Sequence, residues 1–353
     1  MDEFVCRGCG TALTAPLSPV ALPAHAHQSV WHLMLPPLME PGTYAVDPAP
    51  SGPPWRTWEE IGEAEAAARG VFAPVYSVSF GAPGRIVVAP GDTRGTVLIP
   101  EKCAGDCFGP DGRDGPNLAC ERCGLPVATR IDDCSLWQAV WLEPDAVRRV
   151  PTGEATPPPA GWESVAPKRH GTSPVTPDGG WDPRWTAAVG TALAHLLVAS
   201  EGGPVTLPDG PVTDLFGRAA AALLPRGPVA KSVALAGPGL PASGTAAPAP
   251  DIALVPRHPR TGEPWRPPSD ATAVVPLAPD VWAHLALPRE TSPLPASGTL
   301  PDGVLRDDYD YPPPDHPWGM FQPDQQVFRA TLARLPAVRQ PWLRALHDGR
   351  ARP

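Results

Sequence analysis

Phe4-Val5-Cys6-Arg7-Gly8-Cys9-Gly10 lies near the start of the chain, and Leu118-Ala119-Cys120-Glu121-Arg122-Cys123-Gly124 repeats its pattern far downstream. Each stretch consists of an apolar pair followed by Cys-x-x-Cys-Gly. Two thiolates at this spacing can bind one side of a zinc ion, and a second pair completes a tetrahedral site. A glycine after the second cysteine permits a positive φ, which turns backbone N–H groups toward the sulfur atoms. Together the two stretches predict a four-cysteine zinc site.

These motifs resemble the zinc knuckles of zinc-ribbon and treble-clef proteins. The resemblance covers only the residues in and around the motifs, so it implies metal binding without a specific activity. The chain as a whole resembles uncharacterised proteins of high-GC bacteria, and its 25 arginines against three lysines fit such a source. That second resemblance implies no activity either.

The chain has seven cysteines, so more than one ligand set is conceivable. The matched motifs favour one set: Cys6, Cys9, Cys120 and Cys123. A rival set replaces the first pair with Cys103 and Cys107, which closes a shorter loop at a smaller entropic cost. Because zinc binding contributes about 10 kcal/mol or more, which exceeds that difference, we expect the matched motifs to share the ion. Cys103, Cys107 and Cys134 then remain as small buried thiols or, with a histidine, as a second metal site.

Three histidines follow the first motif in a stretch that prolines interrupt. His25 and His27 are two residues apart, and His32 comes directly after Trp31. Neutral imidazoles can bind a metal, although a histidine on a loop or strand face is the commoner case. Both interpretations stay open at the level of sequence.

Four cysteine ligands close the coordination shell of zinc, whereas a catalytic zinc keeps one position open. A redox role is disfavoured because thioredoxin-type cysteine pairs precede a helix that lowers the thiol pKa. Here glycine and strand-like residues follow both pairs. We therefore expect the Zn²⁺ ion to be structural.

Composition narrows the class of protein. The 54 prolines and 34 glycines among 353 residues indicate compact domains with long, irregular loops. A net charge of −9 disfavours nonspecific binding to nucleic acid, which depends on neutralising phosphates. The acidic start lacks the basic region of a signal peptide, and no apolar run is long enough to span a membrane. Paired cysteines suit a reducing compartment, so we expect a cytoplasmic protein without a membrane partner.

The first part of the chain has the pattern of a β domain. Runs rich in β-branched residues at 75–80, 85–89 and 96–99 are separated by turn residues. Two further strands are predicted at 127–131 and 136–142, after the second motif. The second motif is therefore expected within the sheet region.

A segment rich in proline and glycine, 151–180, predicts a connector. Beyond it, Asp182-Pro183 is typical of a helix start, and apolar residues then recur at helical spacing. Short apolar strands alternate with proline-rich loops, and two helices are expected at the C-terminus. The predicted fold class is α+β. A mostly-β, zinc-stapled domain over 1–150 precedes a smaller α/β-type domain over 181–353, in which helices cover a small sheet.

A second cluster of functional groups occupies a proline-rich loop at 302–316. Its members are Asp302, Asp307, Asp308, Asp310, Asp315 and His316. Carboxylates at this density can bind a hard cation or act as acid and base. Their spacing matches no established motif, and a solvated acidic loop is the commoner case.

The sequence lacks the motifs of several large enzyme classes, including the Walker A loop, the Gly-x-Ser-x-Gly elbow and His-Glu-x-x-His. We therefore expect a non-enzymatic interaction or scaffold protein that binds a protein partner. One alternative is an enzyme whose site lies between the two halves and uses the 302–316 loop. The other is a nucleic-acid-binding zinc ribbon, which the negative charge disfavours.

Overall fold

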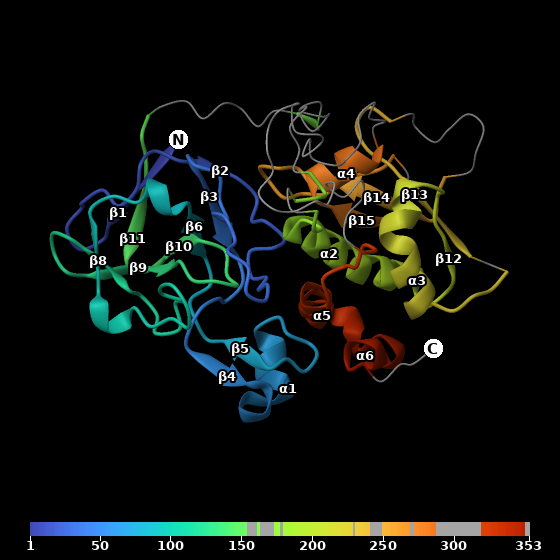
Figure 1. The fold of residues 1–353 in the computed structure, drawn as a ribbon, viewed down its shortest axis with the longest axis horizontal. Coiled ribbons are helices and arrows are strands. Elements are labelled where there is room, and N and C mark those ends of the chain that lie inside the picture. The colour runs from blue at the N-terminus through green and yellow to red at the C-terminus, as the bar shows by residue number, and fades with distance from the viewer. Residues whose placement is uncertain are drawn as a thin grey trace, which may run out of the picture. The chain divides into compact units, whose positions relative to one another are not determined.

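The structure is a computed structural model, shown in Figure 1, that describes most of the chain. The described residues are 1–153, 161–162, 173–176, 179–228, 230–240, 249–268, 272–286 and 319–349. They form two compact units. The N-terminal unit comprises Met1–Ala160, Pro259–Gly262 and Ala333–Asp348, and the C-terminal unit comprises Gly161–His258, Glu263–Leu332 and Gly349–Pro353.

Residues 333–348, assigned from the sequence to the second domain, belong to the first of these units. They contain the end of α5 (Gln325–Arg334), a 3₁₀ turn at Pro336–Arg339 and α6 (Pro341–His347). The predicted connector at 151–180 lies mostly outside the described residues. The predicted domain boundaries therefore stay predictions.

The N-terminal unit is built on a seven-stranded sheet of order β2-β3-β6-β10-β9-β8-β7. The strands are β2 (Ser18–Pro19), β3 (Thr43–Asp47), β6 (Arg85–Val88), β7 (Thr96–Leu98), β8 (Leu118–Cys120), β9 (Pro126–Ile131) and β10 (Ala139–Leu142). Neighbouring strands are antiparallel except for β2 and β3, which are parallel. The prediction of a mostly-β first half with the cysteine motifs is confirmed.

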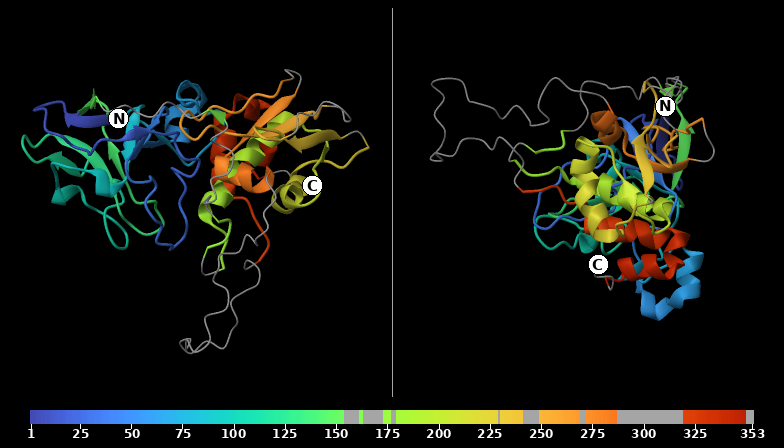
Figure 2. Two further views of the ribbon diagram at one scale, coloured as in Figure 1. Left: turned by 90° about the horizontal axis from the view of Figure 1, so that it is seen from above. Right: turned by 90° about the vertical axis from the view of Figure 1, so that its right-hand side faces the viewer.

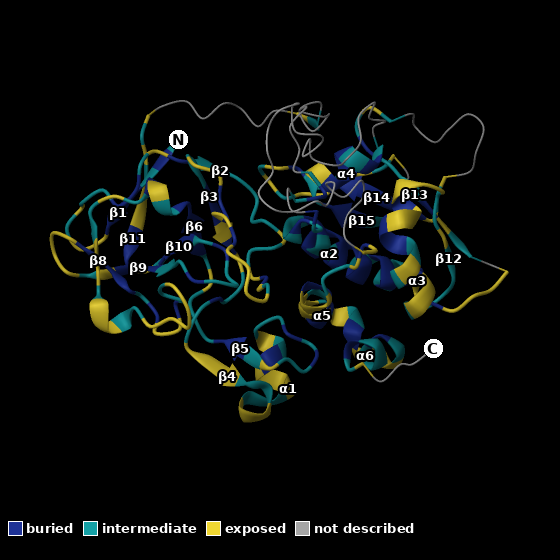
Figure 3. Ribbon diagram, viewed as in Figure 1, coloured by how far each residue is buried: buried dark blue, intermediate teal, exposed yellow. Residues whose placement is uncertain are grey.

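The central strands β6 and β10 are buried along their whole length because both faces of the sheet are covered, as Figure 3 shows. Successive side chains of a strand point to opposite faces. Ile86 and Val88 accordingly join one core cluster, whereas Val87 joins the other with Trp137 and Trp141. Both tryptophans are buried.

A two-stranded ribbon packs on one of these clusters. It consists of β1 (Asp2–Cys6) and β11 (Val147–Pro151), which pair antiparallel. Phe4 and Val147 contribute to the same cluster as Ile86 and Val88. The ribbon therefore places the first cysteine motif beside the main sheet.

A buried carboxylate fastens the start of this ribbon. The Asp2 side chain, 4% exposed, accepts a hydrogen bond of 2.8 Å from the Tyr44 hydroxyl and pairs with Arg149 Nη2 at 2.8 Å. Burial opposes ionisation of this carboxyl, but the hydrogen bonds from Arg149 and Tyr44 outweigh it and lower the Asp2 pKa. The charged form of Asp2 thus joins β1 to β3 and β11.

A separate two-stranded ribbon, with a helix between its strands in sequence, also lies within the first 150 residues. The strands β4 (Trp55–Thr57) and β5 (Ser77–Ser79) pair with each other, so the strand predicted at 75–80 lies outside the main sheet. Helix α1 (Trp58–Ala68) begins with a capping box, in which Thr57 and Glu60 bond each other's backbone N–H groups.

The C-terminal unit contains a parallel sheet of order β12-β13-β14-β15. Its strands are β12 (Val205–Thr206), β13 (Lys231–Leu235), β14 (Ile252–Pro256) and β15 (Ala273–Leu277). Helix α2 (Pro183–Ser200) packs on β14 and β15, and α4 (Pro279–Ala286) packs on β13 and β14 (Figures 1 and 2). The predicted small sheet covered by helices is confirmed.

The helix starts in this unit follow the expected chemistry in one case and depart from it in another. Asp182 caps α2 by accepting a hydrogen bond from the Arg184 N–H at 2.8 Å. The next helical segment instead begins without a side-chain cap, as a π-helical turn at Thr213–Gly217, and continues as α3 (Arg218–Leu223). None of the helices in the described parts of the chain has the length and apolar character that a membrane span requires.

We expect Asp2→Ala to lower the free energy of unfolding at pH 7 by about 1–3 kcal/mol, because it leaves the Tyr44 hydroxyl and Arg149 without their buried acceptor. A carboxyl whose pKa is lowered by folding stabilises the protein above its unfolded pKa of about 3.9, and this contribution is lost as the pH falls. The difference from wild type should therefore narrow between about pH 5 and pH 3. Urea unfolding of the variant and of wild type at several pH values measures this difference in the free energy of unfolding.

Glu3→Ala is the matched control, because Glu3 is the neighbouring acid and lies only half-buried. It should change stability much less than Asp2→Ala. Equal losses for the two variants, or a difference that does not depend on pH, would contradict the role assigned to the Asp2 carboxylate.

Candidate metal centre

The first cysteine motif is a tight turn at the end of β1. The Cys6 N–H donates to the Thr11 carbonyl at 2.8 Å, and the Gly10 N–H donates to the Cys6 carbonyl at 2.9 Å. Gly10 has a φ of +77°, a conformation that glycine adopts without steric cost. The turn brings Cys9 back toward the strand that carries Cys6.

The second motif repeats this turn at the end of β8. The Cys120 N–H donates to the Leu125 carbonyl and the Gly124 N–H donates to the Cys120 carbonyl, both at 2.8 Å. Gly124 has a φ of +73°. The two motifs therefore share their hydrogen bonds as well as their sequence pattern, and the positive φ predicted for both glycines is confirmed.

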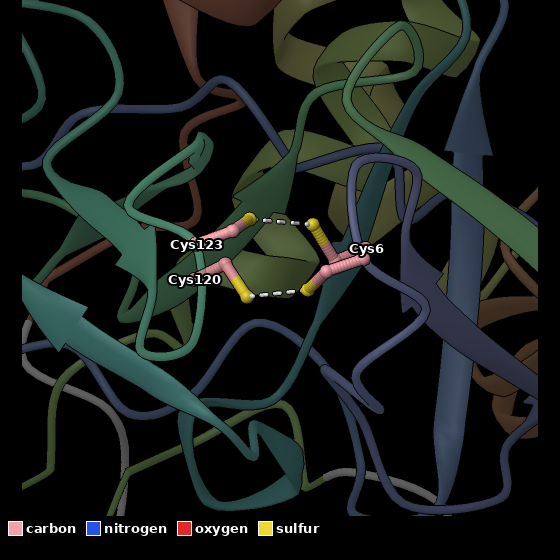
Figure 4. A group of neighbouring side chains, drawn as sticks. Cys6, Cys120 and Cys123 are labelled. Atoms are coloured by element: carbon pink, nitrogen blue, oxygen red, sulfur yellow. Dashed lines mark hydrogen bonds between the residues drawn. The ribbon is translucent and has the colours of Figure 1, made fainter.

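The two turns bring four sulfur atoms together, and Figure 4 shows them facing each other as two pairs. The Cys6 and Cys123 Sγ atoms are 3.6 Å apart, the Cys9 and Cys120 Sγ atoms are 3.5 Å apart, and all four lie within 4.8 Å of one another. Tetrahedral ligands about 2.3 Å from a zinc ion are roughly 3.8 Å apart, whereas a disulfide requires about 2.05 Å. The group has the geometry to hold a metal ion, and its cysteines are free.

The thiols of this group influence one another electrostatically. Hydrogen bonds from the side chain and backbone of Thr11 lower the pKa of Cys9 to about 6. The Leu125 N–H also lowers the pKa of Cys123, but burial and the three neighbouring thiols outweigh it and raise that pKa to about 12. Four thiolates at this distance repel one another, and a bound cation offsets the repulsion.

The group lies at the edge of the hydrophobic core. Cys6 and Cys120 are buried in the same cluster as Phe4 and Val88, whereas Cys123 is exposed. Two of the ligands are thus held by core packing.

Of the other three cysteines, two belong to a second group and one lies outside it. Cys107 and Cys134 form a second group with His32, whose three ligand atoms lie within 4.8 Å of one another. Cys103 is outside this group, and its Sγ donates to the Ile99 carbonyl at 3.2 Å. The sequence analysis considered a second site of Cys103, Cys107 and Cys134 with a histidine, but it did not single out His32 as that histidine.

Two further candidate histidines have contacts of another kind. The His25 ring packs against Trp137 with centroids 4.5 Å apart. His27 Nε2 lies 2.8 Å from the buried Asp47 carboxylate, and its ring stacks on Trp141. Neither histidine belongs to a metal-binding group among the described residues.

The acidic cluster predicted at 302–316 lies outside the described residues. This holds for every member of it: Asp302, Asp307, Asp308, Asp310, Asp315 and His316.

Comparisons with protein-family models, with curated proteins and with solved structures gave no match for this chain. The resemblance to zinc-ribbon and treble-clef proteins therefore rests on the two Cys-x-x-Cys-Gly motifs alone. The geometry of the two cysteine groups is the basis of the function proposed below.

The second turn provides a test of the backbone geometry. We expect Gly124→Ala to cost about 1–2 kcal/mol, because an alanine is strained at a left-handed φ. Gly124→Asn should cost less, since asparagine tolerates this conformation better. Urea unfolding with Zn²⁺ present measures both variants.

Gly91→Ala is the control. Among the described residues, no atom lies within 4 Å of the place a Cβ would take at Gly91 or at Gly124, and Gly91 has no positive φ. Gly91→Ala should therefore change stability little. If it destabilises the protein as much as Gly124→Ala, the left-handed turn is not the cause.

Proposed function

We propose that this chain is a zinc-binding protein whose four-cysteine group holds one structural Zn²⁺ ion, and that its N-terminal unit serves as an interaction or scaffold module for a protein partner. The observation that carries the proposal is the convergence of the four sulfur atoms within 4.8 Å. An all-thiolate tetrahedral set is typical of structural zinc.

The place of the site in the fold supports a structural role. Cys6 belongs to the ribbon of β1 and β11, whereas Cys120 ends β8 in the main sheet. An ion shared by both motifs ties the ribbon to the sheet. Because such a site forms only on folding, the binding free energy of the metal adds to the stability of the fold.

The contacts of Arg7 and Arg130, two of the arginines near the motifs, disfavour a nucleic-acid partner. Arg7 Nη2 donates to the carbonyls of Pro144 and Val147 at 3.4 Å. Arg130 Nη2 lies 2.7 Å from an Asp132 carboxylate oxygen. These guanidinium groups already have partners within the chain, and the chain as a whole carries a net charge of −9. Phosphate binding would require such cations to be available.

The zinc content of variants tests the ligand set. We expect Cys120→Ser to bind one Zn²⁺ ion fewer than wild type, because serine does not replace a thiolate ligand of zinc. Cys103→Ser should keep the full zinc content, since Cys103 lies outside both groups. Native mass spectrometry of the full chain counts the ions. Loss of an ion in Cys103→Ser with none lost in Cys120→Ser would contradict the proposed ligands.

Removal of the metal tests the structural role. A strong chelator should increase amide hydrogen exchange in 2–13, 118–127 and 147–151, because the ribbon and both turns lose their shared ion. The strand at 252–256 and the helix at 183–200 should keep their protection. Exchange mass spectrometry of the same sample reports on all these segments. Unchanged exchange in 2–13 after complete zinc removal would show that the ion is not structural.

A further inference from the structure

The His32, Cys107 and Cys134 group draws its ligands from three separate segments of the N-terminal unit. One imidazole nitrogen and two sulfur atoms lie within 4.8 Å of one another. Tetrahedral ligands of zinc at about 2.0–2.3 Å are roughly 3.5–3.8 Å apart. Small side-chain movements therefore suffice to bring all three atoms onto one ion.

The carboxylate of Asp133 organises two of these segments. It is 3% exposed and accepts hydrogen bonds from four backbone N–H groups. The donors are Asp106 at 2.8 Å, Cys107 at 3.2 Å, Phe108 at 2.7 Å and Cys134 at 2.8 Å. The loop that carries Cys107 is thus fastened to the turn that carries Cys134.

Ser135 forms hydrogen bonds to the third segment, which carries His32. Its Oγ accepts a hydrogen bond from the His32 N–H at 2.9 Å and donates to the Cys134 Sγ at 3.8 Å. Its backbone also accepts from the Val30 N–H and donates to the Leu33 carbonyl, both at 2.9 Å. Residues 133–135 therefore contact the backbone at all three ligands.

Two residues of this arrangement have a strained backbone. His32 has a φ of +48° and Ser135 a φ of +70°. Among the described non-glycine residues, Glu201 at the end of α2 is the third with a positive φ. A left-handed conformation costs about 1–2 kcal/mol outside glycine, and such strain persists mainly at functional sites.

The group also differs from the four-cysteine group in composition and access. Within the described part of the chain, no fourth His, Cys, Asp or Glu joins it. His32 and Cys107 are exposed, and so are their neighbours Trp31 and Phe108, at 86% and 76%. Three protein ligands with one accessible position are the arrangement in which zinc binds an exchangeable fourth ligand.

We infer that His32, Cys107 and Cys134 bind a second Zn²⁺ ion, and that its fourth position takes an exogenous ligand, water at rest and a thiolate or imidazole when one is available. Two thiolates and an imidazole suit zinc among the common divalent ions. Two thiolates balance the 2+ charge of the ion. This site is independent of the four-cysteine group and of the function proposed for it.

Zinc counting is the first arm of the test. Reduced full-length protein should bind two Zn²⁺ ions by native mass spectrometry. His32→Ala and Cys107→Ser should each bind one, whereas Cys103→Ser, which changes a nearby cysteine outside the group, should bind two. A zinc count of zero in Cys107→Ser beside two in wild type would mean that this variant has unfolded. His32→Ala, at an exposed position, then decides the outcome.

Ligand exchange is the second arm. With Co²⁺ in place of Zn²⁺, added imidazole should change the visible absorption spectrum of wild type, because it enters the coordination shell of the open site. The same addition should leave the spectrum of Cys107→Ser unchanged, since its remaining ion has four cysteine ligands.

Three results would overturn the inference. One is a single zinc ion in wild type that Cys107→Ser retains. Another is a cobalt spectrum of wild type that does not respond to imidazole. The last is a Cys107–Cys134 disulfide, found by peptide mass spectrometry in protein kept under reducing conditions, because it would assign these cysteines a redox role.

Discussion

Four sulfur atoms within 4.8 Å of one another are the constraint on which the N-terminal unit depends. The two cysteine pairs lie far apart in the chain, so the ribbon of β1 and β11 has to meet the end of β8. Cys6 and Cys120 also lie in one hydrophobic core cluster. Four thiolates at this distance would repel one another, and a bound cation would offset that repulsion.

The two cysteine groups of this unit differ in how the surrounding chain positions their side chains. In the four-cysteine group, each pair is positioned by a single tight turn with its own hydrogen bonds. In the His32 group, each ligand comes from a different segment, and the Asp133 and Ser135 side chains hold the segments together. The two turns supply four cysteines, enough to fill a tetrahedral shell, whereas the three segments supply three candidate ligands among the described residues.

Two buried carboxylates, Asp2 in the ribbon of β1 and β11 and Asp133 beside the His32 group, each bond separate segments of the chain. Asp2 is 4% exposed and joins β1 to the Tyr44 hydroxyl and to Arg149, and Asp133 is 3% exposed and collects four backbone N–H groups. Burial alone would favour the neutral carboxyl, but hydrogen bonds to the charged form lower both pKa values, that of Asp133 to about 2. Hydrogen bonds to a charged carboxylate thus reinforce the paired ribbon of β1 and β11 and order the loop that carries Cys107.

The sequence by itself determined the features that depend only on residues close together in the chain. The Cys-x-x-Cys-Gly pattern predicted both turns and the positive φ of Gly10 and Gly124, and β-branched runs and a helix start predicted the fold class. These follow from backbone sterics and short-range hydrogen bonds. Only the tertiary structure decided that Cys107 and Cys134 meet His32, while Cys103 does not. Such a meeting depends on how distant segments pack, and no local pattern encodes the distance between them.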